Sequence, residues 1–411
     1  MRVLYNILIH AYSFIIKIAS FFNKKAKLWT DGRKNIIPII KKDFASISAK
    51  TIWIHSASLG EFEQGRPLIE ALKSQYPHIK IVLTFFSPSG YEIRKDYPLA
   101  DFVYYLPSDS PKNVKAFIST IKPSIAVFIK YEFWYNYMHE LDMQKIPFIY
   151  ISAIFRPKQL FFKPCGTWFL NHLKKVNHFF VQNKESYQLL KAKKIHQVSI
   201  SGDTRFDRVT SILKQAQKNE IIKAFKGTST LFLAGSSWPK DEEIIKQLSL
   251  HYPDLKIIIA PHLIDDHHIH QIKALFPNAI TYSQTNKEEA SKASVLIINN
   301  MGMLSSLYQY ADYALIGGGF GAGIHNTLEA ATYGMPIFIG PNYHKFQEAK
   351  DLINQNVISV FNHAEELRKE FEMVSNNKEH YSNIVKTSKE YVQRNSGATD
   401  LIMKKISDIL P

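Results

Sequence analysis

A carboxylate follows a hydrophobic run near the start of the chain, in the stretch SASLGEFEQGRP at residues 56–67. The preceding run, TIWIH, is typical of a buried strand, so Glu61 falls where the next helix begins. Two interpretations fit this placement. The segment from Ser58 to Glu61 matches a capping box, in which the glutamate accepts a hydrogen bond from a free backbone N–H. Alternatively, Glu61 is a general base at the carboxyl end of a strand, where Gly60 leaves room for a substrate.

A second carboxylate, Glu132, ends the apolar run SIAVFIKYE. A lone charge in that place either pairs with Lys130 or Arg156, or it takes part in chemistry.

Arg205 follows the run VSISGD in the segment SGDTRFDRV. A guanidinium beside a strand end could stabilise a developing phosphate or carboxylate charge. The plainer alternative is a surface ion pair with Asp203 or Asp207.

Two glycine-containing turns come later in the chain. Residues 317–336 read GGGFGAGIHNTLEAATYGMP, and GGGFGA matches the dinucleotide fingerprint G-x-G-x-x-A. That fingerprint normally opens the first βαβ unit, so we favour a glycine loop that feeds a phosphate-binding helix N-terminus, with Glu329 placed for sugar hydroxyls. Asn326-x-x-Glu329 is alternatively another capping box. Gly302, in NNMGMLSS, could expose N–H groups to an anion or simply make a turn.

The sequence does not predict a metal-binding or cofactor-binding site. The segment DDHHIH at 265–270 resembles a metal site, but we expect its aspartates to cap a helix and its histidines to be solvated. The sequence has no P-loop, H-E-x-x-H or D-x-D motif, and it predicts neither a metal nor a cofactor. The single cysteine, Cys165, permits no intrachain disulfide and is predicted to be a small buried side chain.

The composition points to anionic partners. The net charge is +15, from 51 Lys and Arg against 36 Asp and Glu, and 45% hydrophobic residues argue against disorder. The basic residues are dispersed, and no nucleic-acid-binding motif is present. The sequence therefore favours a membrane surface or phosphorylated substrates over nucleic acid.

Residues 4–22 form an apolar segment of unusual pattern, LYNILIHAYSFIIKIASFF. A lysine at the centre of a bilayer costs at least about 2.5–3.5 kcal/mol, and Lys17 lies inside the segment. Spacings of three and four residues place the polar positions on one helical stripe. These positions are Asn6, His10, Ser13, Lys17 and Ser20. We predict a helix in the membrane interface with this stripe toward the headgroups, and a spanning helix is the alternative. The lysines that follow predict a cytoplasmic location for the rest of the chain.

Short apolar runs alternate with amphipathic stretches after residue 50, six in each half. This pattern predicts parallel strands buried on both faces and therefore an α/β fold of two doubly wound Rossmann-like domains facing a cleft. The predicted parts are a membrane-associated helix at 1–27, a first Rossmann-like domain at 28–208, a linker at 209–228 and a second Rossmann-like domain at 229–411. Ligands of such sheets bind at the carboxyl ends of the strands, where each motif above lies.

Six motifs in fixed order give a family resemblance over nearly the whole chain. They are HSASLGE, SPSG, YEFWYN, GDTRFD, NNMGML and GIHNTLEAATYGMPIFIGPNYHKFQE. Together they resemble the 3-deoxy-D-manno-octulosonate (Kdo) transferases of lipopolysaccharide synthesis. The resemblance implies a glycosyltransferase B fold and transfer of Kdo from CMP-Kdo to a phosphorylated lipid A precursor. It also implies inversion, independence of metals, and action at the cytoplasmic face of the inner membrane.

The resemblance also implies roles for particular residues. Glu61 takes the place of the general base, and Glu132 and Arg205 take those of the groups that stabilise the transition state. The implied CMP-Kdo contacts are Pro261, His262, Met301, Gly302, Met303, Asn326, Thr327, Leu328 and Glu329. This chain departs from the family pattern in three places, with His262 for an arginine, Met303 for a glutamate and Arg205 for a lysine.

Three other functions remain open from the sequence. A transferase that uses another nucleotide sugar or another lipid acceptor would share most of these motifs. A dinucleotide-dependent oxidoreductase would use GGGFGA. A catalytically inactive membrane scaffold would explain the altered residues 262 and 303.

Overall fold

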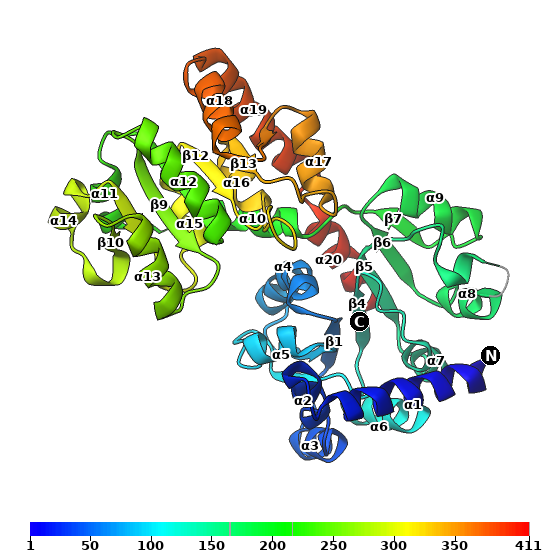
Figure 1. The fold of residues 1–411 in the computed structure, drawn as a ribbon. Helices are drawn as coiled ribbons and strands as arrows, with labels where there is room; N and C mark the ends of the chain where they lie inside the picture. Colours follow the sequence, from blue (N-terminus) through cyan, green and yellow to red (C-terminus); the bar gives the residue numbers. More distant parts are fainter. Residues whose placement is uncertain (164–165, 216, 411) are drawn as a thin grey trace. The chain divides into compact units, whose positions relative to one another are not determined.

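The computed structural model describes residues 1–163, 166–215 and 217–410, so Cys165 lies outside the described residues. The chain divides into two compact units (Figure 1). The first unit is Met1–Arg208 together with the segment that begins at Ser396, and the second is Val209–Asn395.

The first unit is built on a parallel sheet of seven strands in the order β3-β2-β1-β4-β5-β6-β7. The strands are β1 (Thr51–Ser56), β2 (Lys80–Phe85), β3 (Phe102–Tyr105), β4 (Ile125–Ile129), β5 (Phe148–Ala153), β6 (His178–Val181) and β7 (Val198–Ile200). Six of them coincide with predicted runs. The seventh, β3, is a four-residue edge strand whose first two residues are only partly buried, so it lacks the long apolar run of a central strand.

Helices cover both faces of this sheet. They are α1 (Arg2–Ala19), α2 (Lys24–Asp31), α3 (Ile36–Asp43), α4 (Leu59–Gln75), α5 (Pro88–Arg94), α6 (Pro111–Ile121), α7 (Tyr135–Met143), α8 (Thr167–Leu173), α9 (Lys184–Ala192) and α20 (Ala398–Ile409), with a 3-10 turn at Leu160–Phe162. Alternate residues of β1 enter different cores. Trp53 packs with side chains of α3, α6 and α7, whereas Ile52 and Ile54 pack with those of α4 and α20. The predicted burial on both faces is thereby confirmed.

The second unit repeats the plan with the strand order β10-β11-β9-β8-β12-β13-β14, all parallel. The strands are β8 (Leu231–Ser237), β9 (Lys256–Pro261), β10 (Ile280–Thr281), β11 (Val295–Ile297), β12 (Tyr313–Ile316), β13 (Ile337–Ile339) and β14 (Ile358–Val360). The helices are α11 (Glu220–Lys226), α12 (Pro239–His251), α13 (Asp266–Leu275), α14 (Lys287–Lys292), α15 (Leu304–Leu307), α16 (Leu328–Tyr333), α17 (Gln347–Asn354), α18 (Ala364–Ser375) and α19 (Lys378–Asn395), with 3-10 turns at Tyr282–Gln284 and Tyr308–Tyr310. The predicted fold class of two doubly wound sheets is confirmed, and among the described strands of this second sheet the two-residue edge strand β10 escaped prediction.

The chain returns to the first unit at its end, which differs from the predicted domain extent of 229–411. Ile402, Met403 and Ile406 of α20 are buried in the core beside α4. The Asp207 carboxylate fixes the start of this helix, because it accepts hydrogen bonds from the N–H and the hydroxyl of Thr399, both at 2.6 Å. An amphipathic helix does not show in its sequence which sheet it will cover, so the return is decided by packing.

The predicted linker at 209–228 is also structured. α10 (Arg205–Gln215) spans the boundary between the two units, and α11 follows it. Ile222 and Phe225 of α11 are fully buried in the second unit.

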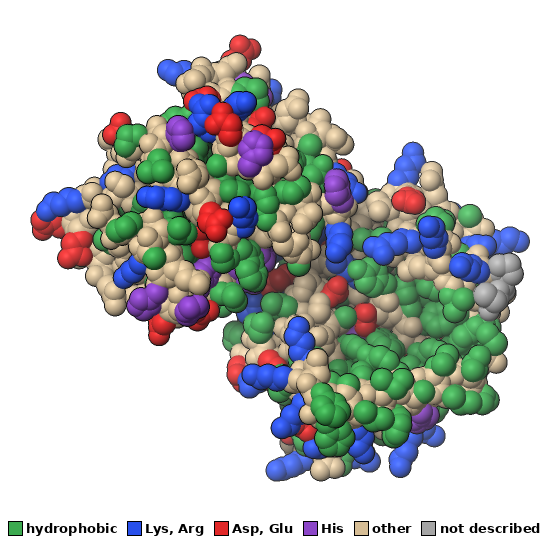
Figure 2. Space-filling view, in the orientation of Figure 1, with side chains coloured by type: hydrophobic (Ala, Val, Ile, Leu, Met, Phe, Trp, Pro, Cys, Tyr) green, Lys and Arg blue, Asp and Glu red, His purple; other side chains and the backbone are tan. Residues whose placement is uncertain are grey.

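The N-terminal helix α1 lies along the first unit with its apolar side outward. The Tyr5 hydroxyl donates to Asp109 Oδ2 at 2.5 Å, and Asn136 Nδ2 donates to Asn6 Oδ1 at 2.9 Å. Side chains on the opposite side are exposed, and they are Val3, Leu4, Ile7, Leu8, Phe14, Ile15 and Ile18. Figure 2 shows hydrophobic side chains gathered over this helix.

The predicted direction of the polar stripe was therefore partly wrong. Asn6, Ser13 and Ser20 are half-buried on the protein side, whereas His10 and Lys17 are exposed. The reason is that buried polar groups of the first unit, such as Asp109, offer α1 hydrogen-bond partners that the sequence does not reveal. Among the described residues, α1 is the helix that is long and apolar enough to cross a membrane.

Candidate active site

The strand orders place a topological switch point in each sheet. In the first sheet, successive connections run outward in opposite directions from β1 and β4, and in the second sheet from β8 and β12. Open α/β sheets bind ligands at the carboxyl ends of the strands near such a point. Glu61 follows β1, Glu132 follows β4 and residues 326–329 follow β12, whereas the other predicted site residues lie at or after the ends of β7, β9 and β11.

Glu61 lies in the first turn of α4, directly after β1, with 13% of its side chain exposed. Its Oε2 accepts a hydrogen bond from the Ser58 hydroxyl, and its Oε1 is 3.7 Å from Lys130 Nζ. Ser58 makes no side-chain bond to the backbone N–H groups of α4, so the Ser58 half of the predicted capping box is absent. A partly exposed carboxylate between a hydroxyl and an ammonium is suited to accept a proton from a bound hydroxyl group.

Sequence reasoning missed Lys130 as the partner of Glu61, because it considered this lysine only as a neighbour of Glu132. The residue directly follows β4 and has a left-handed backbone with φ of 62°. This conformation is rare for a residue with a side chain, and non-glycine residues in it occur preferentially at functional sites.

Glu132 belongs to a polar network at the end of β4. Its Oε2 accepts a hydrogen bond from Trp134 Nε1 at 2.9 Å, and the buried His55 Nε2 lies 3.3 Å from the same oxygen. His55 Nδ1 lies 2.9 Å from the Thr84 hydroxyl, which accepts from Trp53 Nε1 at 2.8 Å, and 3.1 Å from the Thr84 carbonyl oxygen. His55 therefore links Thr84 of β2 to Glu132.

The two cations considered as partners of Glu132 lie elsewhere. Lys130 pairs with Glu61, and the guanidinium of Arg156 lies over the Tyr131 ring, 5.9 Å from its centroid.

Arg205 makes the ion pair with Asp203 that the sequence left open. Its Nε and Nη2 both lie 2.9 Å from Asp203 Oδ2. The same oxygen accepts from Gln64 Nε2 at 2.9 Å and from Gln182 Nε2 at 3.2 Å. Burial raises the pKa of Asp203, but Arg205 and Lys130 outweigh it and hold that pKa below its usual value. Gln64 is on the same helix as Glu61, so Asp203 connects Arg205 to the helix that carries Glu61.

The residues predicted to contact the donor lie at or after the carboxyl ends of β9, β11 and β12. Pro261 is the last residue of β9 and is buried, and His262 after it is exposed. Asn326 Oδ1 accepts from the Leu328 N–H at 3.1 Å, and Asn326 Nδ2 donates to Glu329 Oε1 at 3.1 Å. Asn326 therefore bonds to the first turn of α16, but the N-cap of this helix is Thr327, which makes no side-chain capping bond, so these are not the contacts of the predicted capping box.

The Met301–Met303 turn is open to solvent. Met301 is 83% exposed, and Gly302 has a φ of 88° and open space within 4 Å of where a Cβ would lie. The turn leads through α15 to Tyr308, whose hydroxyl occupies the space beside Gly235 of β8, where a Cβ would lie 2.3 Å from it. Burial raises the pKa of the Tyr308 hydroxyl, and the negative charge of the nearby Glu329 raises it further.

The predicted phosphate sites at helix N-termini are weak in this structure. α15 has four residues and α16 has six, so neither helix sums many peptide dipoles. Charge on a bound phosphate must therefore be met by side chains and loop N–H groups to a larger extent than we predicted from the sequence.

Two aromatic residues that the sequence analysis did not single out stand beside His262. Trp238 follows β8, and its Nε1 donates to His325 Nε2 at 3.0 Å. The His262 ring stacks on both, with centroids 4.8 Å from Trp238 and 4.3 Å from His325. Burial lowers the pKa of His325 to about 4, with a further contribution from His262, so the imidazole is neutral near pH 7. In the sequence, only position could have pointed to Trp238 and His325, because Trp238 directly follows a strand and His325 directly precedes the predicted site residue Asn326.

The glycines of GGGFGA are required by the protein's own backbone. A Cβ at Gly317 would lie 2.2 Å from the Ser236 carbonyl oxygen, and one at Gly319 would lie 2.6 Å from Gly340. The N–H of Gly318 donates to the buried Asp241 at 3.0 Å. Close packing within the sheet edge thus accounts for the glycines without a dinucleotide.

The histidine-rich segment 265–270 is only partly as predicted. Asp265 caps α13 by accepting from the His268 N–H at 2.9 Å, as expected. His268 is buried, contrary to expectation, with Nε2 3.0 Å from Glu242 Oε2. The part of the chain that the structure describes holds no group of three or more His, Cys, Asp or Glu side chains placed to bind a metal ion.

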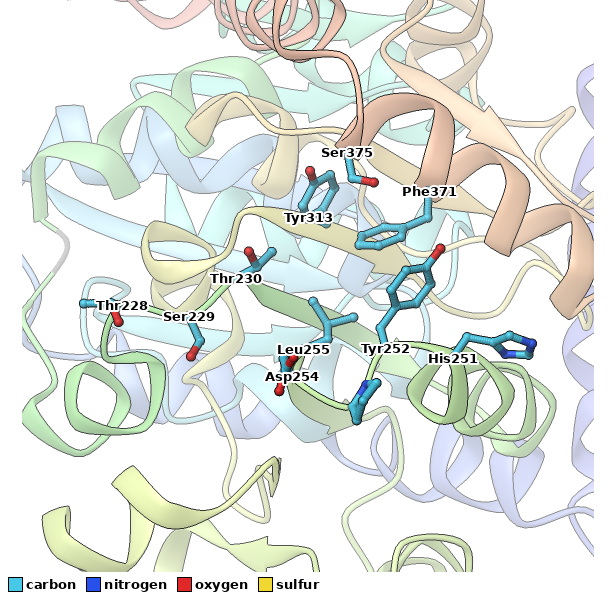
Figure 3. Close-up of a pocket in the computed structure, with 11 residues that line it drawn as sticks. Thr228, Ser229, Thr230, His251, Tyr252, Asp254, Leu255, Tyr313, Phe371 and Ser375 are labelled. Atoms are coloured by element: carbon cyan, nitrogen blue, oxygen red, sulfur yellow. The ribbon is translucent and has the colours of Figure 1, made fainter.

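A cavity of about 580 Å³ in the second unit lies away from these residues (Figure 3). Its lining includes Thr230, Leu255 and Tyr313, which stand at the amino ends of β8, β9 and β12. The motifs lie at the carboxyl ends of the same strands, so this cavity is not the predicted donor site.

Comparison with known proteins shows relatives over most of the chain. Residues 33–208 match the family described as 3-deoxy-D-manno-octulosonic-acid transferase (kdotransferase). The 3-deoxy-D-manno-octulosonic acid transferase of Haemophilus influenzae is 26% identical over 374 residues, which cover 87% of this chain and 86% of the relative. That of Aquifex aeolicus is 29% identical over 354 residues, which cover 83% of this chain and 92% of the relative.

A solved structure shares the architecture. UDP-GlcNAc 2-epimerase from Neisseria meningitidis, bound to UDP-GlcNAc, superposes with a TM-score of 0.60 and 17% identity, and the match covers 87% of this chain and 100% of that one. At this identity the likeness concerns the fold.

Proposed function

We propose, from the match of residues 33–208 to the Kdo transferase family, that this protein transfers Kdo from CMP-Kdo to a phosphorylated lipid A precursor. The observation that carries the proposal is the setting of Glu61. This carboxylate stands at the carboxyl end of β1, partly exposed, between the Ser58 hydroxyl and the Lys130 ammonium. The family similarity supports the donor and the acceptor class.

In the proposed reaction, Glu61 takes the proton of an acceptor hydroxyl while that oxygen attacks the anomeric carbon of Kdo. The bond between this carbon and the CMP phosphate breaks on the opposite side, so the configuration inverts and CMP leaves with the electron pair. Arg205 meets developing negative charge, and Glu132 meets the positive charge on the sugar. Well-aimed groups of this kind contribute about 2.7–4 kcal/mol each to a transition state. No metal or cofactor is assigned to any step.

A transfer assay tests the donor and the acceptor together. The full chain should move radiolabel from CMP-Kdo onto a lipid A precursor, and mass spectrometry should find the lipid heavier by a whole number of Kdo residues. Parallel reactions with UDP-sugars should leave the lipid unlabelled. Transfer from a UDP-sugar in place of CMP-Kdo would favour another nucleotide-sugar transferase and reject this donor.

We also propose that α1 holds the protein at the cytoplasmic face of the inner membrane. Its exposed apolar side chains would enter the bilayer surface, and the exposed Lys24, Lys25 and Lys27 that follow suit anionic headgroups. Tyr5 and Asn6 tie the helix to the first unit, so the whole unit would be held at the surface where the lipid acceptor lies.

Replacing Leu8, Phe14 and Ile15 together by asparagine should abolish binding to vesicles that contain phosphatidylglycerol. Each of these side chains is 58–63% exposed, and burying such a residue fully contributes about 1.5–3 kcal/mol. Vesicle flotation measures the bound fraction. A matched control replaces the equally exposed Leu250 and Met373 of the second unit, at 61% and 53%, and should bind like the unaltered chain. Flotation of the α1 variant with the vesicles would disprove the anchor.

A further inference from the structure

The hydrogen bond between Trp238 and His325 fixes the proton of a histidine at the proposed donor site. An indole N–H can only donate, so His325 Nε2, 3.0 Å from Trp238 Nε1, must accept and carry no proton. A neutral imidazole then has its single proton on Nδ1. Burial and the adjacent His262 keep His325 neutral near pH 7, which leaves this tautomer in place.

His325 stands among the residues that the family resemblance assigns to the donor. Its backbone N–H is bonded to the Gly317 carbonyl at 3.1 Å, which holds it at the end of β12. Asn326 follows it directly, and the exposed His262 ring stacks on its face. Within the described part of the chain, Nε2 has its partner in Trp238, and no protein acceptor is recorded for Nδ1.

Two features of this chain make a neutral hydrogen-bond donor useful for binding an anionic group here. His262 stands where the resemblance implies an arginine, and burial lowers its pKa, so this position does not supply the cation. The helices α15 and α16 are too short to supply much dipole. A preset N–H offers a hydrogen bond to an anionic oxygen without the cost of reorienting the group during binding.

We propose that the Nδ1–H of His325, set in place by Trp238, donates a hydrogen bond to an anionic oxygen of the sugar-nucleotide donor. The inference rests on the proposed function and adds a binding residue to it. The oxygen belongs either to the nucleotide phosphate or to the carboxylate of the sugar, and both are acceptors of the same kind.

Titration calorimetry of the full chain with cytidine and with CMP, together with KM for CMP-Kdo, separates these sources. His325→Leu should weaken the anionic ligand about 10-fold or more, since a hydrogen bond to a charged group is worth that much. Cytidine has neither acid and should bind as before. Weaker binding of CMP with unchanged binding of cytidine assigns the phosphate. A rise in KM for CMP-Kdo with unchanged CMP affinity assigns the carboxylate.

Two further variants distinguish the hydrogen bond from a structural role. His325→Asn places an amide N–H near the position of Nδ1 and should recover most of the affinity. Trp238→Phe keeps a stacked ring but frees Nε2 to take the proton, so it should weaken the anionic ligand several-fold. If Trp238→Phe and His325→Leu both kept the CMP affinity and the KM for CMP-Kdo of the unaltered chain, the inference would be overturned and the proposed function would stand. Failure of the unaltered chain to bind CMP or CMP-Kdo would instead overturn both.

Discussion

Replacing Glu61 by glutamine should lower kcat for Kdo transfer by roughly 10²- to 10⁴-fold, the usual contribution of a general base. Glutamine keeps the size of the side chain and can still accept from Ser58, but it cannot take the acceptor proton. KM for CMP-Kdo should change little, because the donor-site residues lie in the second unit. Initial rates over a range of both substrates measure the two parameters separately.

Glu63 provides the matched control for this experiment. It lies two residues along the same helix and pairs with Arg94 at 2.9 Å, with 32% of its side chain exposed. Glu63→Gln should keep kcat within about twofold, since a surface ion pair contributes little. If Glu61→Gln kept the kcat of the unaltered chain, as Glu63→Gln should, Glu61 would have only a structural role. If both variants lost activity to the same extent, damage to the helix would be the cause.

Replacing Asp203 by asparagine should have the largest effect on stability. The side chain is 7% exposed and accepts from Gln64, Gln182 and Arg205, so the change removes a buried negative charge that pairs with the Arg205 guanidinium. Breaking a buried ion pair by removing one partner costs about 3–5 kcal/mol, and we expect the lower end because Arg205 is 26% exposed. Four of the five tryptophans are in the first unit, so urea unfolding followed by tryptophan fluorescence reports on this unit.

The same pair gives a prediction for acidic pH. The folded-state pKa of Asp203 is depressed, so its contribution to stability is present above the unfolded-state pKa of about 3.9 and is lost as pH falls through the folded-state value. The stability difference between the unaltered protein and Asp203→Asn should therefore be full at pH 7 and shrink below about pH 4. A difference that stayed constant down to pH 3 would show that the carboxylate charge is not responsible.

Asp31 serves as the control carboxylate. It pairs with Lys34 at 2.6 Å on the surface of the first unit. Asp31→Asn should not shift the urea midpoint measurably at either pH, because water screens an exposed pair.

The sequence by itself determined the fold class, because parallel strands buried on both faces require continuous apolar runs. Twelve such runs became twelve of the fourteen strands in the described part of the chain. The two that escaped, β3 and β10, are edge strands of four and two residues, which bury less and need less apolar sequence. The same rule placed Glu61, Glu132 and the glycine loop at strand ends, since loops after parallel strands open at one edge of the sheet.

Only the tertiary structure decided which side chains meet. Glu61 and Lys130 are 69 positions apart by their numbers, 130 less 61, and they lie 3.7 Å from each other because β1 and β4 are neighbours in the sheet. Trp238 and His325 meet in the same way, because β8 pairs with β12. The side of α1 that faces the protein depended on Asp109 and Asn136, and the return of α20 depended on a free apolar surface beside α4. Local patterns fix periodicity and strand ends, whereas partners between distant segments depend on strand order and packing, which no local pattern encodes.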